Sequence, residues 1–220
     1  MTSNLKVLQV IPKLGFGGAE TGCYDIAHYL YENNCESFIV TSGGELTKFI
    51  NKEKVKLIKL PVHSKNPFII FFNTIVLIFI IIFNDISIVH ARSRAPAWSC
   101  FFATKVTGRK FATTFHGTYN FNSKFKRFYN SVMIKSHLII AGSNFIFSHI
   151  KKNYSDYLNK KNKLLVIFGT NILSIIMFYF LYNYITNWPP NYISFFNNYD
   201  LPYCCYELLF HNNTKISCYL

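Results

Sequence analysis

The sequence predicts an α/β domain with a doubly wound, mostly parallel sheet over residues 1–168. Seven short apolar segments, rich in β-branched residues, alternate with segments of helical spacing. Three turns of glycine-rich or polar sequence each follow one of these strands, at the end of the sheet where α/β domains bind ligands. The alternation predicts the fold, and the turns predict where a site lies.

The first half of the domain is expected to contain four strands and three helices. Strands are predicted at Leu5–Ile11, Ser37–Thr41, Lys56–Leu60 and Ile86–His90. Helices are predicted at Ala19–Asn33, Glu45–Asn51 and Pro67–Phe83. The first helix has apolar residues on one face, and the last has proline in its first turn.

The second half repeats the pattern. Strands are predicted at Lys110–Phe115, His137–Ala141 and Leu164–Phe168. Helices are predicted at Ala95–Val106, Lys124–Lys135 and Asn144–Asn153, the last with Ser143 as its N-cap.

The turn after the first strand is rich in glycine. Glycines allow the backbone to approach an anion, and the following helix directs its positive end toward it. Gly15 and Gly17 fit a G-x-G-x-x-G dinucleotide fingerprint, but the third glycine position is Glu20, and no acidic residue ends Ser37–Thr41. These departures argue against a nicotinamide-dependent oxidoreductase. A tight turn without a ligand stays an alternative.

Four segments of the chain resemble family 4 glycosyltransferases, which are retaining enzymes of the GT-B fold. They read GFGGAET after the first strand, IVHARSRAPAW at 88–98, TTFHGTY at 113–119 and IIAGSNF at 139–145. Each is weak alone, but their order and spacing make the resemblance specific over residues 5–168. It implies a Rossmann-like, N-terminal, acceptor-side half of a hexosyltransferase-type enzyme.

The resemblance implies roles for two turns. Gly17 and Gly18 match glycines whose amides approach the donor diphosphate, and Glu20 matches the acid that opens the first helix. His116 matches a catalytic histidine that faces the donor sugar at the interdomain cleft. For His116, a capped turn histidine without catalytic function is the alternative.

The turn after the fourth predicted strand contains two arginines. Arg92 and Arg94 fall on the same rim, where they are expected to hold an anionic acceptor group. A solvated rim without a ligand is the alternative.

The expected reaction transfers a sugar from a nucleotide-sugar to a surface-glycan or lipid-linked acceptor. The resemblance implies no cofactor and no metal, and the six cysteines lack metal-ligand spacing. The net charge of +13 indicates either an anionic partner or AT-rich coding, and no nucleic-acid motif accompanies it. We expect a cytoplasmic protein, with possible contact to the inner face of the cytoplasmic membrane.

The segment Pro67–Phe83 is almost entirely apolar. Its 17 residues fall short of the about 20 that a helix needs to span a bilayer. The sequence favours a helix that packs on the sheet with one face able to touch lipid. A wholly buried helix and a true membrane span are the alternatives.

Residues 169–220 differ in composition from the rest, because Lys215 is their one basic residue. An aberrant tail, out of frame or unstructured, is the favoured interpretation, and the chain is then an inactive fragment without a donor-binding domain. A membrane anchor over 164–185 and a genuine extension stay as alternatives. The alternative functions are a non-catalytic binding module and a membrane protein with apolar segments 67–83 and 164–185.

Overall fold

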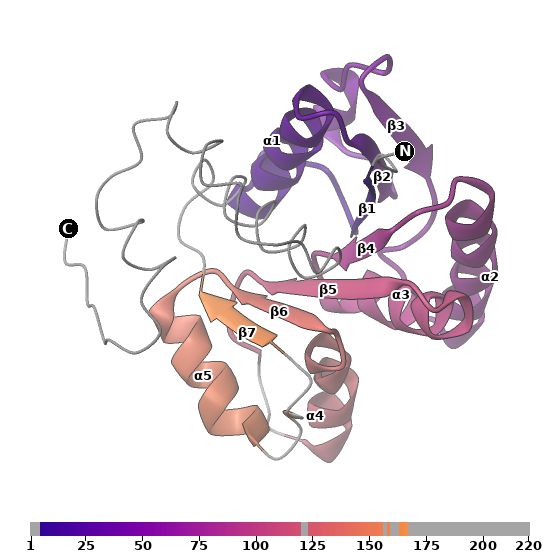
Figure 1. Ribbon diagram of the computed structural model, residues 1–220. Coiled ribbons are helices and arrows are strands. Elements are labelled where there is room, and N and C mark those ends of the chain that lie inside the picture. Colours follow the sequence, from indigo (N-terminus) through magenta and orange to yellow (C-terminus); the bar gives the residue numbers. More distant parts are fainter. Residues whose placement is uncertain (1–4, 120–122, 156–157, 159–162, 167–220) are drawn as a thin grey trace, which may run out of the picture. The chain divides into compact units, whose positions relative to one another are not determined.

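An all-parallel, seven-stranded sheet forms the centre of the domain (Figure 1). The computed structural model describes residues 5–119, 123–155, 158 and 163–166. The strand order is β3-β2-β1-β4-β5-β6-β7. The strands are β1 (Lys6–Ile11), β2 (Glu36–Thr41), β3 (Val55–Lys59), β4 (Ile88–Ala91), β5 (Lys110–Phe115), β6 (Leu138–Ala141) and β7 (Lys163–Val166). The predicted doubly wound fold is confirmed. The segment 169–220 and most of 164–185 lie outside the described residues.

Helices follow the strands in the predicted order. They are α1 (Gly18–Glu32), η1 (Glu45–Lys48), α2 (Pro67–Phe83), α3 (Arg94–Thr107), α4 (Lys124–Asn130), η2 (Ser131–Ile134) and α5 (Asn144–Tyr154), where η denotes a 3-10 helix. The N-caps of α2 and α5 explain where these helices begin. Asn66 Oδ1 accepts a hydrogen bond from Phe68 N at 2.9 Å, and Ser143 Oγ accepts one from Ile146 N at 3.2 Å.

The fourth strand begins later than predicted. The sequence indicated a start at Ile86, but β4 starts at Ile88. Asp85 has a φ of 51°, and Ile86 N donates to Ile81 O at 3.0 Å, so these residues close the end of α2.

The predicted helix Lys124–Lys135 is two elements. α4 ends at Asn130, and η2 continues with the tighter 3-10 turn. Ser131 Oγ donates to Phe128 O at 2.7 Å, and all four residues of η2 are buried. Packing against the sheet therefore overrides the basic helical pattern at this point.

Two apolar clusters lie on opposite faces of the sheet. On one face, α1 buries Cys23 and Ala27 with Ile39 of β2. On the other, α2, α3, η2 and α5 share a larger cluster, which includes Leu77 and Trp98. Figure 1 shows α2 and α3 next to each other along this second face, and the contacts between the two helices are extensive.

The strand order reverses between β1 and β4, which makes this pair the topological switch point. β5 lies on the other side of β4. The three turns singled out in the sequence follow β1, β4 and β5, so they lie at the carboxyl ends of three adjacent strands. The crevice that α/β sheets use for ligands is at this position.

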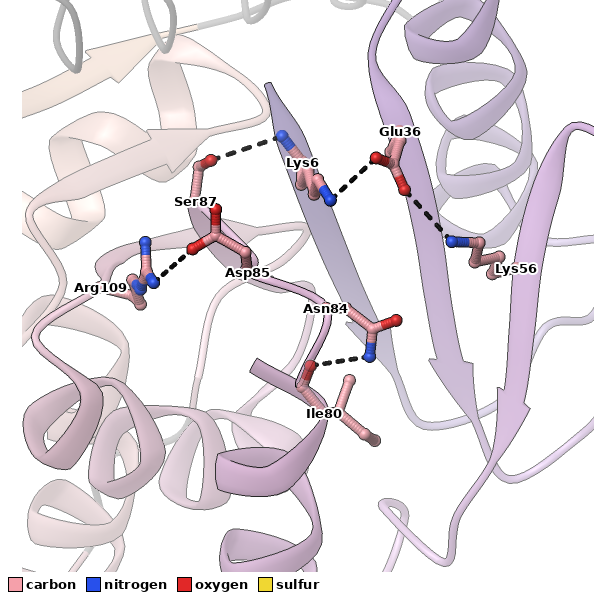
Figure 2. Close-up of polar contacts among 8 residues, drawn as sticks. All are labelled: Lys6, Glu36, Lys56, Ile80, Asn84, Asp85, Ser87 and Arg109. Atoms are coloured by element: carbon pink, nitrogen blue, oxygen red, sulfur yellow. Dashed lines mark hydrogen bonds and ion pairs between the residues drawn. The ribbon is translucent and has the colours of Figure 1, made fainter. Parts of the chain in front are cut away.

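The amino edge of the sheet is held by ion pairs between opposite charges (Figure 2). Glu36 at the start of β2 pairs with Lys6 at 2.9 Å and with Lys56 at 3.2 Å. The hydrogen bond from Lys6 is the main reason why the pKa of Glu36 lies below its usual value. Arg109 before β5 pairs with Asp85 at 2.6 Å. Lys6, Lys56 and Arg109 at this edge therefore have carboxylate partners.

Helix α2 buries only a narrow stripe of its surface. Asn73, Thr74, Leu77 and Ile81 are buried, whereas its other apolar residues include several that are strongly exposed. The exposed ones are Phe68, Phe71, Phe72, Ile75, Phe79, Ile82 and Phe83. In the part of the chain that the structure describes, no helix has the length and apolar character needed to cross a membrane. The expected packing on the sheet with one open apolar face fits this arrangement.

Candidate active site at the carboxyl edge of the sheet

The turn between β1 and α1 is fixed by the neighbouring turn after β2. Leu14 N donates to Gly43 O at 2.7 Å, and Leu14 O accepts from Leu46 N at 3.0 Å. Gly44 has a φ of 134°, and a Cβ at this position would collide with the backbone of Leu14. The glycine pair Gly43–Gly44 therefore positions the Gly15–Gly17 backbone indirectly.

The N-terminus of α1 presents exposed backbone to solvent. Gly17 is the N-cap, with φ −74° and ψ 162°, and its carbonyl accepts from Glu20 N and Thr21 N. The first N–H groups of a helix have no partner within the helix, so the exposed Gly17–Gly18 segment can present amides to an anion. The Glu20 carboxylate lies against Gly17, in the space that a side chain at Gly17 would need.

A buried polar cluster crosses the switch point beneath this turn. Gln9 on β1 is opposite His90 on β4 in the strand register. Gln9 Nε2 donates to Cys23 O on α1 at 3.0 Å, and Gln9 Oε1 accepts from Arg92 Nη1 at 3.1 Å. His90 Nε2 lies 2.8 Å from Thr114 Oγ1. Side chains from β1, β4 and β5 are thereby joined just below the carboxyl edge.

Arg92 is almost fully buried, with 4% of its surface exposed. Burial lowers the pKa of its guanidinium, and the nearby Cys23, Glu20 and Asp25 act in the opposite direction, but an arginine remains charged in proteins. Its Nε has no hydrogen-bond partner among the residues that the structure describes. The expectation that Arg92 lies on the rim is wrong, because its side chain is buried inside the domain. Its partner there, Gln9, is neutral.

His90 is fully buried beside this charge. Burial and then the charge of Arg92 hold the pKa of His90 well below 6.5, so its ring is neutral. Within the described part of the chain, its Nδ1 has no hydrogen-bond partner.

Arg94 lies at the start of α3 and is partly buried. Its Nη1 donates to Asn130 Oδ1 at 3.0 Å, and its guanidinium lies 4.2 Å from the ring centroid of Tyr119. Burial raises the pKa of Tyr119 to about 12, so the phenol is neutral. The structure thus brings Arg94 to the turn that also contains His116.

His116 follows β5 directly and is exposed. The protein atoms around the ring, and then the charge of Arg92, lower the pKa of His116 to about 3. Solvent screens part of this effect at an exposed group, and the imidazole is neutral at pH 7. A neutral imidazole has one donor and one acceptor nitrogen, which suits it to contact sugar hydroxyls.

The two arginines differ from the cations of the amino edge. Lys6, Lys56 and Arg109 face carboxylates, whereas Arg92 and Arg94 donate to the neutral amides of Gln9 and Asn130. Among the residues that the structure describes, neither Arg92 nor Arg94 forms an ion pair with a carboxylate. Together with exposed amides and a neutral histidine, such an edge can bind and stabilise a phosphorylated ligand.

Sequence reasoning missed Gln9, Thr114 and Asn130. Gln9 stands in an otherwise apolar strand, and that single polar residue was the available signal. No group of three or more potential metal ligands occurs among the residues described here.

Residues 16–164 match Glycosyltransferase Family 4. The chain belongs to this family. A glycosyltransferase structure from Rickettsia africae ESF-5 is 43% identical, with a TM-score of 0.64 over 74% of this chain and 42% of that protein. A comparison with curated proteins gives no match.

Two more distant structures show the same fold. One is Anabaena HepE in complex with UDP-glucose, at 13% identity and a TM-score of 0.57, over 76% of this chain and 44% of that one. The other is a sucrose-phosphate synthase chain from Thermosynechococcus elongatus, at 10% identity and a TM-score of 0.61, over 81% of this chain and 98% of that one. The chain spans less than half the length of the Rickettsia and Anabaena proteins, and the match covers the Rossmann-like, N-terminal half of the GT-B fold.

Proposed function

We propose that this domain forms the acceptor-side half of an enzyme that transfers a hexose from a nucleotide-sugar to a surface glycan or lipid-linked saccharide. The observation that carries the proposal is the carboxyl edge at the switch point. Exposed amides at Gly17–Gly18, two arginines with neutral partners and a neutral His116 follow three adjacent strands there. Membership of family 4, and the UDP-glucose bound by HepE, support this class of donor.

In this proposal the donor diphosphate lies at the N-terminus of α1. The amide of Gly18 and the positive end of the helix favour its negative charge, which grows as the bond to the sugar breaks. Arg92 adds a buried positive charge below the site, which acts at low dielectric without touching the ligand. These groups, with those of a second domain, supply the electrostatic stabilisation, and we propose no metal or other cofactor.

We assign His116 to the donor sugar and Arg94 to the acceptor. The neutral ring of His116 can donate to or accept from a sugar hydroxyl at the edge of the cleft. The guanidinium of Arg94 has further N–H groups, beyond the one that Asn130 accepts, which can donate to an anionic acceptor group. Glu20 forms the wall of the diphosphate site, beside Gly17.

The open face of α2 supports a place at the inner face of the cytoplasmic membrane. A row of exposed phenylalanines, including Phe68, Phe72 and Phe83, is a larger apolar surface than solvent contact favours. Contact with lipid would remove this surface from water and bring a lipid-linked acceptor to the enzyme.

We also propose that the 220-residue chain alone does not transfer sugar. Family resemblance puts most donor contacts in a second domain, and the residues that the structure describes form one α/β sheet only. Weak binding of a nucleotide diphosphate to this half is still expected.

The backbone N–H of Gly18 allows a sharp test. Gly18 is the first residue of α1, where proline is tolerated, and the extended conformation of Gly17 suits a residue before proline. Gly18→Pro removes the N–H, whereas Gly18→Ala keeps it, and a Cβ there meets nothing within 4 Å. We expect UDP, ADP, GDP or dTDP to shift the NMR signals of Gly17, Gly18 and Gly117 in the ¹⁵N-labelled chain.

Loss of one charge-assisted hydrogen bond costs about 1.5 kcal/mol, so Gly18→Pro is expected to raise the Kd of the bound nucleotide about tenfold relative to Gly18→Ala. Equal Kd values for the two variants, or shifts that avoid this turn, would show that the diphosphate does not bind at the N-terminus of α1.

A further inference from the structure

A groove of about 900 Å³ lies between helices α2, α3 and α4. Its volume is at the upper end of the range of about 300–1,000 Å³ that is typical of small-ligand pockets. Ile70 and Phe71 come from α2, Trp98 and Phe102 from α3, and Phe128 from α4. We call it the α2–α4 groove, and its lining is mainly apolar and aromatic.

The wall formed by α4 is fixed to α3. Trp98 Nε1 donates to Tyr129 O at 3.1 Å, and Arg94 Nη1 donates to Asn130 Oδ1 at 3.0 Å. The rings of Trp98 and Phe128 lie 5.4 Å apart. These contacts fix α4 relative to α3, so this side of the groove is preformed.

Three cations line the groove as well, and all lie at the beginning of their helices. Lys65 precedes α2, Arg94 is the first residue of α3, and Lys126 is the third residue of α4. No carboxylate is among the lining residues, and neither lysine forms an ion pair within the described ranges. Helices of this sheet begin at its carboxyl edge, so the cations lie at the end nearest the candidate active site.

Apolar residues extend the groove away from that edge. Ile70 and Phe71 lie one turn into α2, and Phe102 lies two turns into α3. The groove therefore has a cationic end beside the active-site turns and an apolar end remote from them. This polarity fits a ligand with an anionic head and a hydrocarbon chain.

We propose that the α2–α4 groove binds one hydrocarbon chain of a phosphorylated lipid, with the phosphate at Lys65, Arg94 and Lys126. The inference deepens the proposed function, on which it rests for the identity of this lipid as the carrier of the acceptor. The head group then lies next to Arg94, which also contacts Tyr119 of the His116 turn. An acceptor saccharide joined to that phosphate can reach the reacting sugar while the hydrocarbon chain of the lipid stays in the groove.

Fluorescence of Trp98 provides a direct readout of binding. The chain has two tryptophans, Trp98 and Trp188, so Trp188→Phe leaves the one in the groove. We expect octyl, decyl and dodecyl phosphate, each below its micelle concentration, to change this fluorescence with Kd values that fall about fourfold per methylene until the groove is filled. Inorganic phosphate and decanol serve as the two halves of the ligand, and each is expected to bind at least tenfold more weakly than decyl phosphate.

Matched variants separate the groove from general charge and hydrophobicity. Lys65→Gln with Lys126→Gln is expected to weaken decyl phosphate binding at least tenfold. Lys124→Gln with Lys152→Gln removes the same charge from exposed residues outside the groove and is expected to change Kd less than twofold. On α2, Phe71→Ala is expected to weaken binding, whereas Phe79→Ala, which is also exposed but does not line the groove, is not.

The proposal is overturned if decanol binds as well as decyl phosphate, if chain length has no effect, if both lysine pairs matter equally, or if no alkyl phosphate binds. Its failure can be told from failure of the proposed function. Gly18→Pro is expected to leave decyl phosphate binding unchanged, and the Lys65 and Lys126 double variant is expected to leave nucleotide diphosphate binding unchanged.

Discussion

Arg92 Nη1 donates a hydrogen bond to Gln9 Oε1 at 3.1 Å, across the pair of strands where the sheet order reverses. The two residues are 83 positions apart, and both are buried. The bond joins the floor of the α1 turn to the turn after β4, so it affects both the stability of the domain and the charge beneath the diphosphate site.

Gln9→Leu is therefore expected to destabilise the domain by about 3 kcal/mol, because it leaves a buried guanidinium without its partner. The double variant Gln9→Leu with Arg92→Leu is expected to recover part of this loss, since the unpaired charge is then absent. Urea unfolding monitored by circular dichroism gives both values. A double variant that is no more stable than Gln9→Leu would contradict this view of the pair.

His90 is expected to make the domain sensitive to acid. Its folded pKa lies well below 6.5, so below pH 6.5 the unfolded chain binds a proton that the folded chain does not. Stability from this residue is therefore present above pH 6.5 and is lost as pH falls, by at most about 1.4 kcal/mol per pH unit.

The variant His90→Gln can keep a hydrogen bond to Thr114 but does not titrate. Between pH 7.5 and 5, urea unfolding is expected to show a smaller loss of stability for this variant than for the native chain. Equal losses of stability in the variant and in the native chain would mean that His90 is protonated in the folded state.

Gly43 and Gly44 offer a matched test of the scaffold. Both have positive φ, so alanine at either position costs about 1–3 kcal/mol of strain. A Cβ at Gly44 also collides with the Leu14 backbone, whereas one at Gly43 meets nothing within 4 Å. Gly44→Ala is thus expected to cost at least about 1 kcal/mol more than Gly43→Ala in thermal or urea unfolding. Equal losses would show that the two turns are not held together by this close approach.

The exposed face of α2 predicts reversible binding to lipid. Replacing Phe68, Phe72 and Phe83 by serine removes apolar surface that would enter the membrane, at about 1.5–3 kcal/mol per side chain. Sedimentation with anionic vesicles is expected to show at least a tenfold loss of binding. The circular dichroism spectrum should not change, because these side chains are exposed. Unchanged vesicle binding by the folded triple variant would exclude α2 as the contact.

Much of the fold follows from local sequence, and most of the site's contacts do not. Pro67 and the almost entirely apolar segment up to Phe83 predict both ends of α2, because a helix start signal and an apolar segment are local properties. The hydrogen bond between Gln9 and Arg92 depends on which strands become neighbours in the sheet. The sequence motif predicts only that Arg92 lies at the end of its strand. Arg92 is buried because it packs under α1, and this burial contradicts the prediction that Arg92 lies on the rim. The α2–α4 groove was likewise not foreseen, because its lining comes from three helices distant in sequence.

We propose that this domain supplies the acceptor side of a nucleotide-sugar cleft, with His116 at the sugar. A chimera tests it directly, with residues 1–166 of this chain joined to the second domain of the Rickettsia africae glycosyltransferase, which is 43% identical over the matched region. The parent Rickettsia enzyme, assayed on a panel of nucleotide-sugars, identifies the donor. We predict that the folded chimera releases nucleotide diphosphate from that donor and that His116→Ala lowers kcat at least about 100-fold. A folded chimera without activity on the parent's donor, or with the same kcat after His116→Ala, would show that this domain does not supply the acceptor side with His116 at the sugar.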